Sequence, residues 1–226
     1  MKSLLLTSAA TMLLATTSQA AIIDVVQTAG DAFGAGGSGA AEIIAAPEFA
    51  LDDNVTNTHM QGFDEAQGVF LNAALDADAG IDAIAAGQLV NSHMIFLNTD
   101  GGARGEHFGV EWTFDGAILG VMSNSSGSLE FASTSILGAA GTTYQTAPLG
   151  ARGLESNNGT GASPNDGYLV FAPNSIRVSM EVTEPGDWIR VVTAVAPVPI
   201  PATMPLLLVG LGGLGFVARR KRRASS

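Results

Sequence analysis

The hydrophobic pattern in the middle of the chain has the period of two that is typical of β-strands. Residues 109–114 place Val110, Trp112 and Phe114 on one side and polar residues on the other, which predicts a half-buried strand. Residues 89–99 are apolar on both faces near their middle, as expected for a central strand. Further strands are expected at residues 63–75, 117–122, 129–136, 168–171, 176–182 and 187–195.

The first of two expected hairpins follows the strand at residues 109–114. Asp115-Gly116 comes directly after this strand, and Asp-Gly between apolar segments is the strongest short-range hairpin signal. Residues 117–122 are apolar again and have strand character. The pattern therefore predicts that these residues turn back and pair with residues 109–114.

The second expected hairpin is the clearest strand pair in the chain. In residues 176–182 an apolar side chain occupies every second position, and residues 187–195 again have strand character. Pro185-Gly186 lies between them and fits the two central positions of a type II turn. We therefore expect the two segments to pair with each other.

The remaining segments of the body have weak patterns. Residues 29–50 and 138–167 are rich in Gly and small polar residues and are interpreted as loops; the second is unusually long for a compact domain. Residues 79–86 could form a short helix. Because no long amphipathic helix is convincing, the pattern of about eight short strands predicts an all-β protein, specifically a jelly-roll-like β-sandwich.

Both ends of the chain carry targeting signals. Residues 1–20 contain Lys2, then a mostly apolar core, then Ser18-Gln19-Ala20, which has small residues at the two positions that signal peptidase recognises. This pattern predicts a secretory signal peptide that signal peptidase cleaves between Ala20 and Ala21. The predicted exported domain is therefore residues 21–197.

The C-terminal segment has three parts in a fixed order. A Pro-containing motif comes first, an apolar run at residues 204–218 follows, and a basic cluster closes the segment. This order predicts a transmembrane helix at about residues 203–218 with its C-terminal end in the cytoplasm. The motif is Val198, Pro199, Ile200, Pro201 and Ala202, and the basic cluster is Arg219, Arg220, Lys221, Arg222 and Arg223.

These residues resemble a VPLPA-CTERM sorting signal, a variant of the PEP-CTERM class. The resemblance covers about 26 of the 226 residues, and Ile200 stands where the family motif has Leu. It implies that residues 198–226 form a sorting signal, and that an exosortase, a membrane-embedded protease, recognises it and cleaves at the motif. The alternative is an ordinary single-span membrane anchor. The body also resembles domains found ahead of such signals, through residues 86–93, 114–121 and 185–192, which implies a β-rich fold and no particular activity.

The predicted exported domain, residues 21–197, is strongly acidic and has no cysteine. The chain has no cysteine, so no disulfide stabilises the exported domain. Residues 21–197 keep four arginines against all 21 acidic residues, which is a net charge of −17. A surface of this charge disfavours nucleic acid and anionic lipid as partners, and favours divalent cations or a saline medium.

Asp76, Asp78 and Asp82 are the best candidate metal ligands. Carboxylates at alternate positions of a turn can converge on Ca²⁺, which takes six to eight oxygen ligands. The spacing differs from an EF-hand loop because Gly80 occupies the position of the third ligand. The alternative is a solvated acidic loop. If Ca²⁺ binds, it should raise the melting temperature of the exported domain, whereas superimposable curves with chelator and with Ca²⁺ would rule it out.

Candidate catalytic residues are few. His59, His93 and His107 are the only histidines, and their spacing lacks a zinc-ligand pattern. We expect His93, within a strand, to be satisfied by a hydrogen bond, although Ser92-His93 with an acid would form a triad. No nucleophile elbow is present.

Paired carboxylates and tryptophans raise a second catalytic hypothesis. Glu106, Glu111 and Asp115 invite comparison with a glycosidase. Trp112 and Trp188 could stack on sugars, but the alternation around Trp112 favours a core position.

The sequence therefore predicts an exported, non-catalytic protein that passes through an inner-membrane intermediate to the cell surface or the extracellular matrix. Its expected role is structural or adhesive, with extracellular polysaccharide as a possible partner. The alternatives are a carbohydrate- or Ca²⁺-binding module and a secreted hydrolase.

Overall fold

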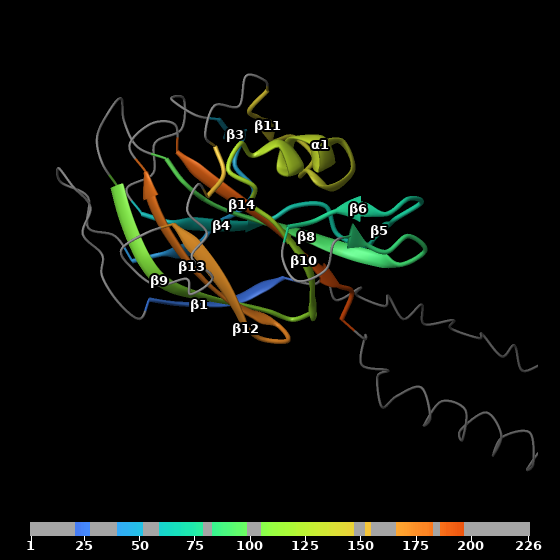
Figure 1. Cartoon of the computed structure of the whole chain (residues 1–226), viewed down its shortest axis with the longest axis horizontal. Helices are drawn as coiled ribbons and strands as arrows, with labels where there is room; N and C mark the ends of the chain where they lie inside the picture. Colours follow the sequence, from blue (N-terminus) through green and yellow to red (C-terminus); the bar gives the residue numbers. More distant parts are fainter. Residues whose placement is uncertain are drawn as a thin grey trace, which may run out of the picture. The chain divides into compact units, whose positions relative to one another are not determined.

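The protein is all-β with little helix, as the sequence predicts. The computed structural model describes residues 21–27, 40–51, 59–78, 83–98, 105–146, 152–154, 166–182 and 186–196, which all belong to the compact unit Gln19–Ala196. These residues form fourteen strands and one helix, and eight of the strands have four or more residues (Figure 1).

A four-stranded antiparallel sheet forms one layer. Its order is β1–β9–β13–β12. Apolar and polar residues alternate along β13, and the apolar ones are buried, because one face of this sheet is covered and the other is open to solvent. The strands are β1 (Ile22–Gln27), β9 (Gly105–Phe114), β12 (Gly167–Ala172) and β13 (Ser175–Val182).

A six-stranded sheet forms the second layer. Its order is β10–β14–β8–β4–β2, and β5 pairs with β8 beside this path. Most pairs are antiparallel, while β2 and β4 are parallel. The strands are β2 (Glu42–Ile43), β4 (Gln61–Asp64), β5 (Val69–Phe70), β8 (Leu89–Leu97), β10 (Ile118–Met122) and β14 (Asp187–Ala194).

The two sheets pack face to face around the largest hydrophobic cluster. The four-stranded sheet contributes Trp112 and Met180, and the six-stranded sheet contributes Ile95, Ile189 and others. The Trp112 ring lies so close to Gly62 that a Cβ there would approach one of its ring carbons to 2.5 Å. The two sheets are therefore closely packed at Gly62, and a larger side chain at this position would be destabilising.

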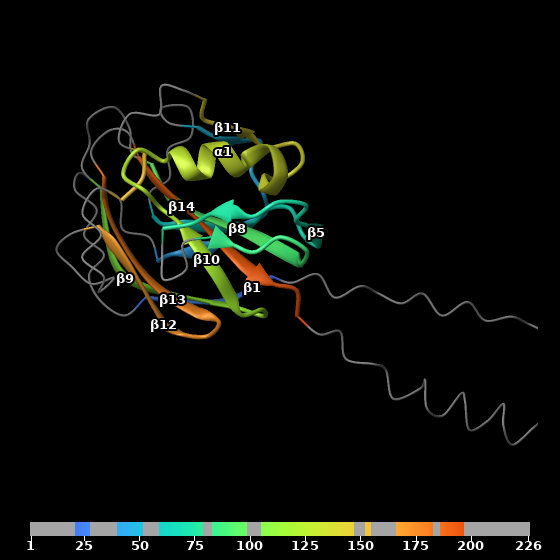
Figure 2. The same cartoon turned by 45° about the vertical axis from the view of Figure 1, so that its right-hand side comes forward.

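A third layer covers the opposite face of the six-stranded sheet (Figure 2). Its side chains complete two smaller hydrophobic clusters, one around Phe63 and Trp188 and the other around Val90 and Val192. This cover explains why β8 and β14 are buried on both faces. The layer consists of α1 (Ser128–Leu137), the pair β3 (Phe49–Ala50) and β11 (Thr143–Tyr144), and the pair β6 (Leu75–Asp76) and β7 (Ala83–Ile84).

Both predicted hairpins are wrong. β9 and β10 belong to different sheets, and so do β13 and β14. The segment at Asp115-Gly116 carries the chain from one sheet to the other, where a Cβ on Gly116 would collide with the Ala194 carbonyl oxygen. Turn residues therefore mark where the chain changes direction, but long-range burial decides which strand becomes the partner.

Residues 129–136 are not a strand but most of α1. The buried residues Glu130, Ser133 and Leu137 recur with helical spacing, and Gly127 precedes the helix in a left-handed conformation. The Asn124 side chain accepts a hydrogen bond from Leu129 N at 2.9 Å, which satisfies one of the free N–H groups of the first turn. A short apolar and polar window of eight residues therefore did not distinguish helix from strand.

Other differences concern β1 and several two-residue strands. β1 was not predicted, and the expected loops at residues 29–50 and 138–167 contain β2, β3 and β11. Residues 83–84 form β7 rather than helix, while residues 79–82 lie outside the described part of the chain. Residues 63–75 hold the end of β4, then β5 and the start of β6, instead of one strand region. Two-residue strands like these carry too few positions for a period to be read.

Candidate functional site

The most enclosed polar cluster lies between β14 and α1. Arg190 donates from Nε to Glu65 Oε2 at 2.6 Å and from Nη2 to Glu65 Oε1 at 2.8 Å, and both side chains are fully buried. Ser92 Oγ donates a further hydrogen bond to Glu65 Oε2 at 2.6 Å. Burial disfavours the Arg190 cation, but Glu65 more than offsets this, so the pKa of Arg190 is raised.

This ion pair fastens α1 to the six-stranded sheet. Arg190 Nη1 donates to Ser133 Oγ at 2.6 Å and to the carbonyl oxygen of Glu130, and Nη2 reaches Thr134 Oγ1 at 3.2 Å. One guanidinium thus holds three residues of the helix. Since every one of these contacts is internal and most are buried, the cluster has the geometry of a structural clamp rather than of a reaction site.

Glu130 is the unusual member of this region. Its carboxyl group is buried, and neither oxygen has a hydrogen-bond partner among the described residues. Desolvation raises the pKa of Glu130 to about 8, although the Arg190 cation opposes this rise. Glu130 is therefore mostly protonated at neutral pH, next to an Arg190–Glu65 pair that remains charged.

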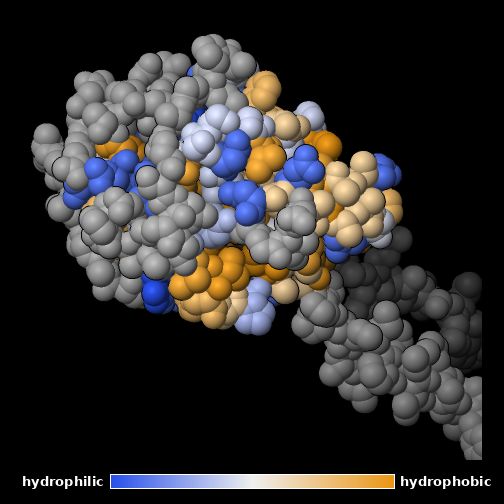
Figure 3. Space-filling view, in the orientation of Figure 1, coloured by the Kyte–Doolittle hydropathy of each residue, from blue (hydrophilic) through white to orange (hydrophobic). Residues whose placement is uncertain are grey.

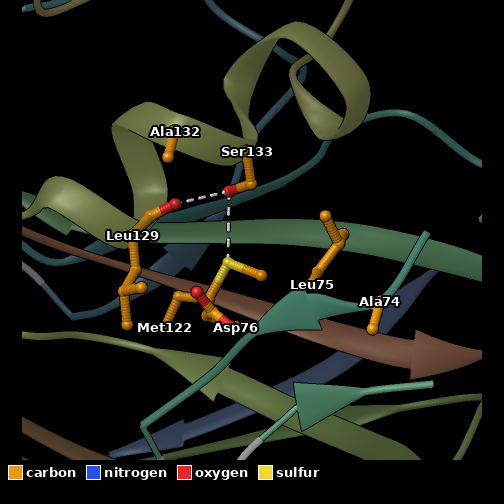
Figure 4. Close-up of a pocket in the computed structure, with 7 residues that line it drawn as sticks. All are labelled: Ala74, Leu75, Asp76, Met122, Leu129, Ala132 and Ser133. Carbon is orange, nitrogen blue, oxygen red and sulfur yellow. Dashed lines mark hydrogen bonds between the residues drawn. The ribbon is translucent and has the colours of Figure 1, made fainter. Parts of the chain in front are cut away.

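A small hollow opens between α1, β6 and β10, with a volume of about 160 Å³ (Figure 4). Among the described residues of its wall, Asp76 is the only acidic one and Ser133 supplies the only hydroxyl group. Ser133 Oγ already contacts Leu129 O at 2.8 Å and Met122 Sδ at 3.1 Å. The hollow is below the roughly 300 Å³ of an ordinary small-molecule pocket and offers few free polar groups.

Of the three predicted metal ligands, Asp76 is the one that the structure places in the wall of this hollow. Asp76 lines it, whereas Asp78 accepts hydrogen bonds from Ser123 N at 3.0 Å and Ser123 Oγ at 2.7 Å. Burial of its carboxylate raises the pKa of Asp78. Asp82 lies outside the described residues, within which no three His, Cys, Asp or Glu side chains converge on a metal-sized site. Calcium binding stays a prediction.

A second polar chain runs through the interior between the two sheets. Asp64 Oδ1 lies 2.7 Å from His93 Nδ1, and His93 Nε2 lies 3.0 Å from Thr193 Oγ1. This order of acid, imidazole and hydroxyl is that of a nucleophile triad. Thr193 is fully buried, however, and the Phe114 ring stacks against the imidazole at 4.7 Å. Among the described residues the hydroxyl is therefore enclosed by protein, and the arrangement is that of an internal hydrogen-bond chain.

The histidines therefore lie in three separate environments. His93 is buried and hydrogen-bonded, which confirms the expectation for it. His107 Nδ1 accepts a hydrogen bond from Met60 N at 3.1 Å, and His59 Nε2 lies 2.7 Å from a Glu42 carboxylate oxygen.

The glycosidase hypothesis gains no support from the positions of its residues. Glu111 lies on the open face of the four-stranded sheet, where Arg177 Nε donates to its carboxylate at 3.1 Å. Asp115 lies beyond the end of β9, and its backbone N–H donates to Ala21 O at 3.2 Å. Trp112 is fully buried, which confirms its expected core position; Trp188 is fully buried as well, so the sugar-stacking hypothesis is wrong for both.

Of the predicted processing residues, the structure describes only Ala21. The signal peptide, the motif at residues 198–202, the expected transmembrane helix and the basic cluster lie outside the described residues. Within those residues, no helix is long and apolar enough to cross a membrane.

The first and last residues of the described domain lie at the same end of the sheets (Figure 1). Ala21 O accepts a hydrogen bond from Asp115 N, and Ala194 N donates to Ala117 O at 2.7 Å. The short connection between β9 and β10 thus touches both ends of the domain. No family model, curated protein or solved structure matches this chain.

Sequence reasoning missed the Arg190–Glu65 pair and the Asp64–His93–Thr193 chain. A signal for the first was available, because the body has only four arginines and Arg190 lies within a strongly apolar strand. Its partner is 125 residues away, and no local pattern indicates such a distance.

Proposed function

We propose that the chain is an exported, non-catalytic protein of the cell surface or extracellular matrix, sorted through its C-terminal segment by an exosortase-type protease. The order of Pro-containing motif, apolar run and basic cluster carries this proposal. It implies signal peptidase and exosortase as processing partners, and an inner-membrane intermediate held by residues 203–218 until the motif at Val198–Ala202 is cut.

The geometry of the described domain is compatible with this route. Ala21 and Ala194 are both hydrogen-bonded to the short connection between β9 and β10. The two predicted membrane-directed segments therefore begin at the same end of the domain. A domain with both ends together can be held close to a membrane by either segment without unfolding. This arrangement supports the proposed order of two cleavages, one at each end.

A structural or adhesive role fits the described surface better than catalysis does. The Arg190–Glu65 cluster is closed, the Thr193 hydroxyl is buried, and the hollow is small. The open features are instead the outer face of the four-stranded sheet and its last strand, β12, which has no charged residue and exposes Val170 and Phe171. Figure 3 shows hydrophobic surface in the region where Figure 1 places β12. We propose that the protein works in an environment of extracellular polysaccharide. We also propose that its fold is a jelly-roll-like β-sandwich.

The C-terminus of the mature protein tests the proposal. In a strain with the processing protease, mass spectrometry should find a chain that ends at or near residues 198–202, and in a strain without it a chain that retains Arg219–Arg223. Replacement of all five basic residues by Gln should abolish processing, while the same number of Glu→Gln changes on the body surface should not. An unprocessed, cytosolic chain in both strains would overturn the proposal.

A Ca²⁺-binding module is the second candidate, because Asp76 is exposed beside the hollow and Asp78 follows it by two residues. Melting curves with chelator and with millimolar Ca²⁺, for the wild type and for Asp76→Asn, separate this candidate from the first.

A further inference from the structure

Backbone contacts define one end of the domain, the end at which its first and last described residues lie. Ala21 and Ala194 are both hydrogen-bonded to the connection between β9 and β10. Val90, near the start of β8, pairs with Ala194, and Ile118 N donates to the Pro173 carbonyl oxygen at 2.7 Å, which adds the turn between β12 and β13. We call this end the terminal rim, and it comprises residues 21–23, 68–71, 85–90, 114–118, 172–175 and 193–196.

The terminal rim carries the three most exposed large hydrophobic side chains of the described residues. Ile23 is 56% exposed, Phe70 53% and Leu89 51%. Phe70 and Leu89 are directly opposite each other where β5 pairs with β8, so they form one apolar surface. Figure 3 shows hydrophobic surface in the region where Figure 1 places β5 and β6. Exposed apolar side chains gathered at one place are typical of a contact surface.

The same rim is nearly uncharged, although the domain is strongly acidic. Among the described residues of the rim, Asp115 is the only charged one. At the other end of the four-stranded sheet, Glu106 and Glu181 are paired across β9 and β13. Glu42, Asp166 and Asp187 also lie at the far ends of their strands. A membrane surface can therefore approach the rim with less electrostatic repulsion than it would meet at the opposite end.

The predicted membrane helix follows the rim closely in the chain. Residues 197–202 separate Ala196, the last described residue, from the helix expected at residues 203–218. Six residues span at most about 20 Å when they are fully extended. A tether of this length, attached at the rim, holds the rim nearer to the bilayer than any other part of the domain.

We propose that the terminal rim is a membrane-contacting surface, which rests on the bilayer through Ile23, Phe70 and Leu89 while the C-terminal segment holds the chain. The inference rests on the proposed inner-membrane intermediate and names the surface by which the domain faces that membrane. It places the motif at Val198–Ala202 at the bilayer surface, within reach of a membrane-embedded protease.

The tether makes a small apolar contact sufficient. A domain that is already held at the membrane has a high effective concentration there, so the contact does not have to bring it from solution. Phe and Leu side chains gain free energy when they leave water, and interfacial segments bury such side chains about 5–10 Å into the headgroup region. Two copies held in one membrane both turn this rim towards the bilayer, which favours lipid over a second copy as the occupant.

The absence of cysteine allows a direct test on the full chain. Single-cysteine variants Leu89→Cys and Phe70→Cys carry an environment-sensitive fluorophore on the rim. Ile43→Cys is the matched control, because Ile43 is also an exposed hydrophobic residue and pairs through Gly62 with the distant part of β8. Each labelled chain is reconstituted into phosphatidylcholine vesicles at several protein-to-lipid ratios, with and without a spin-labelled lipid that quenches the fluorophore.

The probes should report different surroundings. With the spin-labelled lipid, the probes at Leu89 and Phe70 should lose about half of their fluorescence, whereas the probe at Ile43, about 20 Å further along the sheet, should lose almost none. Phe70→Glu in the Leu89→Cys background should reduce the quenching, because a carboxylate resists transfer to the interface, while Ile43→Glu should leave it unchanged. Since these side chains are exposed, equal melting temperatures should show that every variant is folded.

Three results would overturn the proposal, and they differ in what else they affect. If the chain floats with the vesicles but the Leu89 and Ile43 probes are quenched equally little, the rim does not touch lipid and the membrane anchor stands. If the Leu89 signal changes only with the protein-to-lipid ratio and is not quenched by lipid, the rim binds a second copy. If the chain does not float with vesicles, the proposed inner-membrane intermediate fails together with this inference.

Discussion

The two faces of β14 are both buried, but by different kinds of contact. Towards the four-stranded sheet, Ile189 and Val191 pack in an apolar cluster that holds Trp112. Towards α1, Trp188 and Val192 flank the fully buried Arg190. The first face gains free energy from non-directional apolar burial, whereas the second requires one arrangement of helix and sheet because the hydrogen bonds of a guanidinium are directional.

This difference concerns specificity more than stability. A buried ion pair is weak support for stability, because desolvation offsets much of the Coulomb attraction. As a hypothesis for this protein, the Arg190–Glu65 pair instead defines where α1 docks, since Arg190 also contacts Ser133 and Thr134. The apolar face could accept other side chains of similar volume with little change in position.

The largest expected effect comes from breaking the pair on one side only. Arg190→Met should lower the free energy of unfolding by about 3–5 kcal/mol, because Glu65 would then be buried without its partner. Urea denaturation measures the change. The double variant Arg190→Met/Glu65→Leu should recover a large part of the loss, and equal stability of the single and double variants would contradict the unpaired-charge explanation.

Truncation on the apolar face should cost somewhat less. Ile189→Ala removes buried methyl groups and leaves a cavity between the sheets, with an expected loss of about 2–4 kcal/mol in urea denaturation. Ile189→Val is the matched control and should lose about 1 kcal/mol. If Arg190 defines where α1 docks, Arg190→Met should lower the protection of the α1 amides from hydrogen exchange and Ile189→Ala should not. The opposite result would contradict this difference between the two faces.

Glu130 makes the helix-facing side sensitive to pH. Its pKa is about 8 in the fold and 4.5 in an unfolded chain, so the folded state binds this proton more tightly. The resulting stability is fully present below about pH 4.5 and is lost as pH rises towards 8. Glu130→Gln removes this dependence and should be more stable than the wild type at pH 9 by roughly 2–3 kcal/mol, with a smaller difference near pH 5. Parallel pH profiles for the two proteins in thermal melts would refute the buried neutral carboxyl group.

The smallest effect is expected on the open face of the four-stranded sheet. Glu111→Ala breaks a partly exposed ion pair with Arg177 and should cost less than about 1 kcal/mol, with most of that lost in 1 M salt. A loss as large as that of Arg190→Met would mean that this face is covered in solution.

Local patterns predicted burial well where one face of a strand is open. In β13 the apolar residues at every second position are all buried, while Arg177 and Glu181 on the other face are partly exposed. The same patterns did not predict that both faces of β14 are buried. In this strand Arg190 and Thr193 are as inaccessible as their apolar neighbours. Arg190 bonds to Glu65 and Thr193 bonds to His93, so these polar side chains find their partners inside the protein.

The sequence by itself determined the all-β class and the positions of β8, β9, β13 and β14, and the targeting signals at both ends stay predictions. Only the tertiary structure decided which strands pair, that residues 129–136 are helical, and that Glu65 meets Arg190. The physical reason is that the period of a sequence reports which faces are buried, while the choice of partner depends on contacts between residues far apart in the chain.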